Sequence, residues 1–559
     1  MRKLFLILFS ICFSNILTQA QVSIDGRHVF VDTLTNMFLA CVPEQLFDGD
    51  TTLTVTLEQG WKQISIDGED ITTDSYTFHN INAEHVWPIT LTADDGSQLQ
   101  SNLQFTFLPI VQLCGTFGYD YQPATFVFAC PDSIHTDTLT AQAKWRGGTT
   151  NSSNKHKRNY KVKFDDDHTF LGMRNDNNWI LDAGQPDVFR LRNRIAMDLW
   201  NDMGTLPYYA DQEPKARNGV SGRVVEVFLN NEYRGIYNFS ENIDRKQMKL
   251  KKIDKETGEI RGCLYKGISW ESTQMTDTLF TYDNTTEALR GFEVKYPDLS
   301  DNDTTDWAPL VEAINFVRMS SDDEFIAHVE EYFDVPPLVD YSLLLSVVNA
   351  LDNSGKNMFW AVYDKTVDRR LTIAPWDLDC TFGQRWGGTL STDFDGVASP
   401  LYITDVDVWV FYRLYQFNYK GFNDSLNQRY AELRQSIFAT DSLIARFTNY
   451  YLAIKNSGAA ARETDKWSGD IDIKGEAINF EEEYTYISKW ITQHMELLDL
   501  LTFPLYYTEE FFYQQAIDST PYVQRSTYYI YDLQGRQFSN SKLLPKGIYI
   551  KNGRKFVVK

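Results

Sequence analysis

The chain has 559 residues, 43% of them hydrophobic, and its 76 acidic residues outnumber 53 basic ones to give a formal net charge of −23 at pH 7. Because this length exceeds the size at which a single hydrophobic core stops growing, we expect two or three domains. The acidic balance argues against nucleic acid as a partner, since no bulk positive charge is present to attract phosphates. The dispersed histidines argue against a zinc site.

The first twenty residues have the pattern of a secretory signal peptide. A basic start, Met1-Arg2-Lys3, precedes a short apolar stretch from Leu4 to Phe13, and Ala20 is the small residue at the expected cleavage point. The apolar stretch is too short to span a membrane. We therefore expect an exported protein without a transmembrane segment that begins at Gln21 and is extracellular, on the cell surface or periplasmic.

Residues 21–115 contain short alternating strands, such as residues 52–57 and 64–67, separated by Asp-Gly turns. This pattern predicts a small β-sandwich that serves as a spacer or adhesion module. Five cysteines follow the signal peptide, and an odd number cannot all pair within one molecule. A disulfide between Cys114 and Cys130 is one interpretation, and scattered buried thiols are the favoured one.

Residues 160–164 predict a strand in which Tyr160, Val162 and Phe164 face one side while Lys161 and Lys163 face the other. Either lysine could bind phosphate groups, with Lys163 preferred by its position, although an exposed strand with solvated lysines is the alternative. Three further cations, Arg146, Lys157 and Arg158, flank a Gly/Ser/Thr-rich loop that could fold over phosphates.

Residues 188–200 predict a helix that ends at Gly204 and carries three arginines but no glutamate. Residues 224–239 then predict a strand, a turn at Asn230-Asn231 and a second strand. Glu241 follows this hairpin directly. It could lie beside a nucleotide, or form a structural ion pair with Arg245 or Lys246.

The segment from Asp352 to Asn357 places a carboxylate five residues before an amide, and Asp377 and Asp379 come directly after one predicted hairpin, residues 358–375. The apolar residues 338–350 predict a helix that ends just before Asp352. In isolation, Asp-Asn-Ser-Gly would be a common turn. The combination, however, supplies the oxygen ligands and proton acceptor of Mg-assisted phosphoryl transfer, in the order found in protein kinases. We therefore expect Asp352 to be the base, Asn357 and Asp377 to bind Mg or Mn, and Asp379 to be a second carboxylate ligand.

Several segments in the same order resemble the CotH kinases, a family of atypical protein kinases. They are Trp145–Thr150, Lys157–Phe164, Asn230–Tyr237, Asp352 and Pro375–Gly383. The resemblance covers about residues 125–505 and implies a kinase-like fold that binds ATP with Mg and phosphorylates Ser or Thr of a protein substrate. The chain lacks the Gly-rich loop, the His-Arg before Asp352 and the A-P-E motif of ordinary protein kinases, as the CotH group does.

After predicted helices at about 425–503, residues 520–559 predict a compact β-module. This tail resembles the C-terminal sorting domains of secreted proteins from Bacteroidetes-type bacteria, which implies attachment to the cell surface or release. A simple β-module is the alternative.

We thus expect an α+β protein in which an atypical protein-kinase-like two-lobed domain lies between a small β-sandwich and a short C-terminal β-module. The expected activity is transfer of the ATP γ-phosphate to Ser or Thr, with Mg or Mn as the cofactor metal. The competing hypothesis is a non-catalytic surface adhesin or binding module on the same fold.

Overall fold

The structure is a computed structural model that describes residues 22–148, 155–385, 408–470 and 478–505, together with the backbone of the C-terminal strands between residues 530 and 558. The expected signal peptide lies outside the described residues. Within these ranges the chain is mixed α+β, which confirms the expected class. No helix among the described residues combines the length and apolar composition needed to cross a membrane.

The N-terminal part is a sheet with a buried cluster that includes Phe38, Trp87 and Phe105. Alternation accounts for its strands, because Leu53 and Val55 are buried while the threonines between and beside them are more exposed. Along the sheet the strand order is β6-β5-β8-β9-β3-β2-β1-β4-β7. The strands are β1 (Val22–Ile24), β2 (Arg27–Asp32), β3 (Met37–Cys41), β4 (Thr51–Leu57), β5 (Trp61–Ile66), β6 (Glu69–Asp70), β7 (Ser75–Phe78), β8 (Trp87–Ala93) and β9 (Gln98–Thr106).

A closed β-barrel follows, with Tyr160, Val162 and Phe164 in its buried interior, as the alternation predicts. Strands β10 and β15 close the barrel by parallel pairing. The strand order is β10-β11-β12-β13-β14-β16-β15. Their bounds are β10 (Ile110–Gly115), β11 (Gln122–Ala129), β12 (Thr136–Arg146), β13 (Asn159–His168), β14 (Asp176–Asp182), β15 (Gly222–Leu229) and β16 (Glu232–Ser240). Residues 110–115, which we had placed at the end of the N-terminal module, are therefore a barrel strand.

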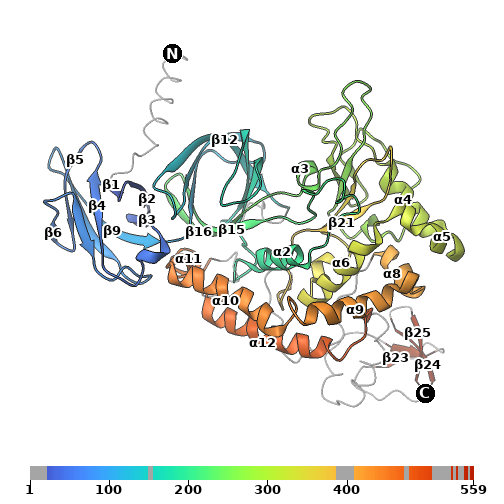
Figure 1. Cartoon of the computed structure of the whole chain (residues 1–559). Helices are drawn as coiled ribbons and strands as arrows, with labels where there is room; N and C mark the ends of the chain where they lie inside the picture. The colour runs from blue at the N-terminus through green and yellow to red at the C-terminus, as the bar shows by residue number, and fades with distance from the viewer. Residues whose placement is uncertain are drawn as a thin grey trace.

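The N-terminal sheet is packed directly against the barrel. Phe30 of β2 stacks on Phe228 of β15 with ring centroids 5.6 Å apart, inside a small buried cluster shared by the two units. The Arg27 guanidinium donates to the carbonyls of Pro131 and Ser133. The sheet is thus part of one packed body with the barrel (Figure 1).

The remaining part combines a second sheet with helices, some of which lie beside the barrel. The sheet has the order β18-β19-β17-β20-β21, with bounds β17 (Cys263–Gly267), β18 (Ala288–Leu289), β19 (Phe292–Tyr296), β20 (Met358–Val362) and β21 (Thr372–Pro375). The helices are α2 (Arg192–Met203), α3 (Arg245–Met248), α4 (Ala308–Met319), α5 (Asp322–Tyr332), α6 (Val335–Val348), α8 (Trp409–Gln416), α9 (Phe422–Arg434), α10 (Thr440–Asn456), α11 (Ala459–Trp467) and α12 (Phe480–Leu498). Figure 1 shows α10 and α12 side by side below the barrel and α2.

Helix α6 is buried along nearly its whole length, as expected for a helix that is apolar on all faces. Adjacent prolines start it, and Asn349 ends it in the left-handed conformation, with φ of 51°. This helix delivers the chain to Asp352, as the sequence predicts.

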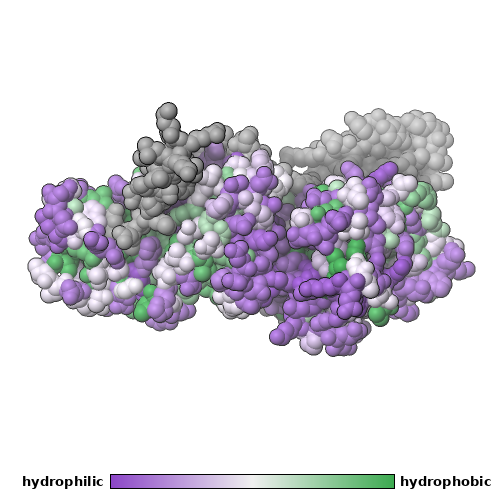
Figure 2. Space-filling view, turned by 90° about the horizontal axis from the view of Figure 1, so that it is seen from above, coloured by the Kyte–Doolittle hydropathy of each residue, from purple (hydrophilic) through white to green (hydrophobic). Residues whose placement is uncertain are grey.

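The C-terminal strands have the order β23-β22-β24-β25, with bounds β22 (Ile530–Asp532), β23 (Gln537–Phe538), β24 (Gly547–Lys551) and β25 (Arg554–Val558). On the face seen from above, hydrophilic residues predominate and apolar residues are scattered between them (Figure 2).

Candidate functional site

Asp352 and Asn357 lie in direct contact in the loop after α6. The Asn357 Nδ2 donates to Asp352 Oδ2 at 2.8 Å, and the Lys356 Nζ lies 3.0 Å from Asp352 Oδ1. Asp352 is only 8% exposed and Asn357 6%. The spacing of five residues therefore does bring the carboxylate and the amide together, and Lys356 is a partner that the sequence analysis did not identify.

Asn353 links this loop to the segment that carries the other carboxylates. Its Nδ2 donates to the carbonyls of Asn357 at 3.1 Å and Trp376 at 2.6 Å, and the Trp376 N–H donates back to the Asn357 carbonyl at 3.0 Å. Asn357 and Asp377 both adopt left-handed backbone conformations, with φ of 55° and 56°. Short polar side chains tolerate this conformation better than other non-glycine residues.

The segment Asp377-Leu378-Asp379 is not the extended strand that we expected, because β21 ends at Pro375 and Asp377 is left-handed. Leu378 is fully buried, Asp377 is exposed and Asp379 is partly buried. Burial, followed by the charges of Asp377, Asp182 and Asp352, raises the pKa of Asp379 well above its usual value. These carboxylates are therefore close enough to repel one another.

Asp182, at the end of barrel strand β14, was missed by the sequence analysis. Burial and the charge of Asp377 raise its pKa, although Arg146 and a hydrogen bond from Asn193 act in the opposite direction. Asn193 of α2 donates to Asp182 Oδ2 at 2.8 Å, and its Oδ1 accepts from the Leu378 N–H at 2.9 Å. A lone Asp at a strand end carries no spacing signal, which is why its role appears only in the fold.

The arginines of α2 have structural roles. Arg192 pairs with Asp187 and Glu483 in a fully buried cluster, and Arg194 donates to the Val220 carbonyl. The helix thus contributes Asn193 to the carboxylates, and Arg194 also lines the pocket beside them.

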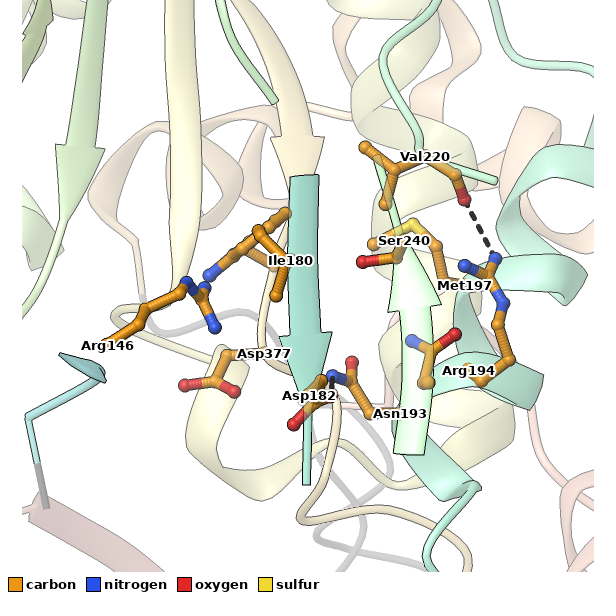
Figure 3. A pocket seen from close by; sticks show the side chains of 11 residues that line it. Arg146, Ile180, Asp182, Asn193, Arg194, Met197, Val220, Ser240 and Asp377 are labelled. Carbon is orange, nitrogen blue, oxygen red and sulfur yellow. Dashed lines mark hydrogen bonds between the residues drawn. The ribbon is translucent and has the colours of Figure 1, made fainter. Parts of the chain in front are cut away.

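A pocket between barrel and carboxylate segment is lined by Arg146, Asp182, Asn193, Trp376 and Asp377, among others (Figure 3). The Arg146 guanidinium lies over the Trp376 ring, 5.0 Å from its centroid. Of the two strand lysines, Lys163 is exposed, whereas Lys161 is partly buried and near Arg146. Burial, with repulsion from Lys295, Arg146 and Lys144, lowers the pKa of Lys161 to about 8. Lys161 is therefore the lysine nearer the pocket cations, while the phosphate-binding role of either lysine stays a prediction.

Two other residues expected to bind nucleotide, Lys157 and Arg158, have partners within the protein. The Lys157 ammonium is buried against Glu463 at 2.7 Å and donates to the Ile236 carbonyl. The Arg158 guanidinium stacks on Trp145, 4.3 Å from the ring centroid. Their position in a Gly/Ser/Thr-rich stretch suggested a phosphate loop, but residues 149–154 of that stretch lie outside the described residues.

Glu241 is committed to backbone contacts. Its Oε1 accepts from the Arg174 N–H at 2.8 Å and its Oε2 from the Ser221 N–H at 2.9 Å. It is 4% exposed. Within the described residues Glu241 forms no ion pair with Arg245 or Lys246, and its expected position beside a nucleotide stays a prediction.

The residues expected to bind Mg or Mn are carboxylate and amide oxygen donors. Within the described ranges, no group of three or more His, Cys, Asp or Glu side chains is arranged to hold a metal ion. Mg²⁺, however, is usually held by one or two carboxylates together with substrate phosphates. Asp377 and Asp379 beside the Asn357 amide are hard oxygen donors whose mutual repulsion a divalent cation would relieve, so the residues fit such a metal.

All five cysteines after the signal region are free thiols, so the favoured interpretation holds and the Cys114–Cys130 disulfide does not form. Cys380 lies buried beside Asp379, and burial followed by the Asp379 charge raises its thiol pKa.

The fold and site define a mixed α+β protein in which carboxylates and cations face one another across a pocket. The CotH family model, described as CotH kinase protein, matches residues 143–498. The chain therefore belongs to the CotH kinase family, which associates it with kinase chemistry and, in general, with ATP and a divalent metal. A search of curated proteins found no match.

Proposed function

We propose that the chain is an exported atypical kinase that transfers the γ-phosphoryl group of ATP to a Ser or Thr hydroxyl of a protein substrate. The observation that carries this proposal is the arrangement around Trp376: the Asp352–Asn357 pair and the Asp377/Asp379 segment are joined through Asn353, and Arg146 faces them from the barrel. In this proposal the barrel and the helical part correspond to the two lobes of a kinase-like domain.

Asp352 is the proposed base. Its carboxylate accepts the proton of the acceptor hydroxyl while that oxygen forms a bond to the γ-phosphorus and the bond from phosphorus to the bridging oxygen breaks, releasing ADP. Lys356 and Asn357 hold one carboxylate oxygen each, which fixes the orientation of the base. The contribution of these residues is positioning, since the transferred group needs little covalent assistance.

Asp377, Asp379 and Asn357 are the proposed metal ligands, because the Asn357 amide nitrogen is used by Asp352 and its oxygen remains for a cation. A bound Mg²⁺ or Mn²⁺ would neutralise phosphate charge. Arg146 and Lys161 are the proposed phosphate-binding cations on the barrel. In this proposal the protein is exported, and its C-terminal module attaches it to the cell surface or accompanies its release.

The deciding experiment incubates the protein from Gln21 onward with labelled ATP and Mg²⁺ or Mn²⁺, alone and with co-secreted proteins, beside an Asp352→Asn control. We expect label on Ser or Thr that depends on metal and on Asp352. ATP binding without any transfer would instead support the binding-module hypothesis.

A further inference from the structure

The Trp376 ring lies near two cations that come from different sheets. Arg146 of barrel strand β12 lies 5.0 Å from the ring centroid, and Lys266 of β17, in the second sheet, lies 6.0 Å from it. Trp376 is 7% exposed. The barrel and the second sheet therefore both direct a positive charge toward this ring.

Lys266 has an unusual environment for a lysine. It is partly buried, and its Nζ makes no hydrogen bond or ion pair with any residue in the described part of the chain. Its Nζ lies over the Trp376 ring and is affected by the charges of neighbouring residues. Burial lowers its pKa to about 8; Asp377 opposes this effect, whereas Arg146 and Lys295 add to it.

Lys266 is not alone in this environment. Lys161 of β13 is also partly buried, and its Nζ makes no hydrogen bond or ion pair with a described residue. The same two cations, Arg146 and Lys295, repel it. Lys161 and Lys266 thus lie near two further cations, Arg146 and Lys295. Lys295 is paired with Glu293, and Asp377 attracts Lys266 from the pocket side, but neither the Lys161 nor the Lys266 ammonium has a direct ion-pair partner among the described residues. A cluster of cations is unfavourable because like charges repel, and a bound anion with several negative charges would stabilise it. Phosphate groups fit this requirement, because Lys and Arg side chains bind them well.

We propose that Lys266 is a phosphate-binding residue that completes the site begun by Arg146 and Lys161, so that a triphosphate chain connects the barrel to the second sheet. The inference deepens the proposed function and rests on it for the identity of the natural ligand. The cation cluster itself does not depend on catalysis.

The test measures binding of inorganic tripolyphosphate by calorimetry at low salt without metal, using the whole chain from Gln21. We expect Lys266→Met to weaken binding by about tenfold or more, because a charge-assisted contact is lost. Lys266→Arg should restore most of the affinity. Lys62→Met, which removes an exposed lysine of the N-terminal sheet, is the charge-matched control and should bind as the wild type does.

The unliganded melting temperature provides a second measurement. Because removing Lys266 relieves repulsion, Lys266→Met should melt at or above the wild-type temperature, whereas loss of a structural residue would lower it. Equal affinity of Lys266→Met and wild type, equal weakening by Lys62→Met, or no binding of tripolyphosphate to wild type would each overturn the inference. Tripolyphosphate binding that depends on Lys266, together with no phosphoryl transfer from ATP, would leave the inference standing and reject the proposed kinase function.

Discussion

The Asn193 side chain accepts a hydrogen bond from the Leu378 N–H at 2.9 Å, which connects helix α2 to the segment that carries Asp377 and Asp379. The same side chain donates to Asp182 at 2.8 Å. One amide therefore sets the relative position of the barrel end, α2 and the carboxylates.

Replacing Asn193 with Ala should loosen the Asp377 segment. We expect metal-dependent ATP binding to weaken about tenfold and the free energy of unfolding to fall by roughly 1–3 kcal/mol, since buried polar groups lose their partner. Asn427→Ala is a matched control, because the Asn427 amide donates to the Phe503 carbonyl and accepts from the Phe503 N–H. It should lose comparable stability with unchanged ATP affinity; equal loss of affinity in both variants would reject the positioning role of Asn193.

Asp352→Asn should lower phosphoryl transfer by at least about 100-fold, the usual contribution of a general base, and leave ATP affinity within about twofold. Asparagine keeps the shape of the side chain beside Asn357. Lys356→Met should have a smaller effect, because it removes only one of the two contacts that orient the carboxylate. Labelled transfer and calorimetry measure the two properties separately, and retained transfer in Asp352→Asn would contradict its role.

Replacing Asp377 and replacing Asp379 should have different effects on metal-dependent ATP binding. Asp377→Asn should abolish the metal-dependent part of ATP binding, because Asp377 is the exposed carboxylate at the pocket. Asp379→Asn should leave weaker binding that is recovered at higher Mn²⁺. Titration of ATP with and without metal distinguishes them, and the reverse order would exchange the two assignments.

Lys157 should contribute to the free energy of unfolding rather than to nucleotide binding. Lys157→Met leaves the buried Glu463 with one cation fewer and should cost about 3–5 kcal/mol, as for other broken buried ion pairs. Lys466→Met, on the same helix as Glu463, breaks a partly exposed pair with Glu232 and should cost less than about 1 kcal/mol. Thermal melting measures both. A Lys157→Met protein that melts like wild type but binds ATP poorly would return Lys157 to the nucleotide site.

His494 should make stability depend on pH. It is buried, donates to the Ser346 carbonyl, and has its pKa lowered from 6.5 to about 4 by burial. The unfolded chain therefore binds a proton at this histidine at a higher pH than the folded chain does. The contribution of neutral His494 to the free energy of unfolding is complete above pH 6.5 and is lost as the pH falls toward 4, by about 3 kcal/mol. His494→Gln should reduce the fall in melting temperature between pH 7 and 4.5, whereas His79→Gln, which replaces an exposed histidine, should not. Identical pH dependence in all three proteins would contradict this account.

The sequence predicted what depends on local pattern. The alternation of residues 160–164 identified the interior of the barrel, and the apolar residues 338–350 identified the helix that ends at Asp352. It did not identify Asp182, Asn193 and Lys266, because each acts through a partner far away in the chain. Nor could alternation decide between Lys161 and Lys163, because it places both lysines on the same face of the strand. Which of the two lies near other cations depends on the neighbouring strands.

The pairing of β10 with β15 has a consequence for the order of folding. Between these partners the chain contains β11, β12, β13, β14 and α2. A chain that emerges from its N-terminus onward thus leaves the edges of β10 and β14 open to aggregation until β15 and β16 arrive. In the finished protein the N-terminal sheet lies against β15 through Phe30 and against the β15–β16 turn through Thr33, which donates to the Asn231 carbonyl. Its residues precede the closing strands in the chain, so we expect this surface to be available for β15 when that strand emerges.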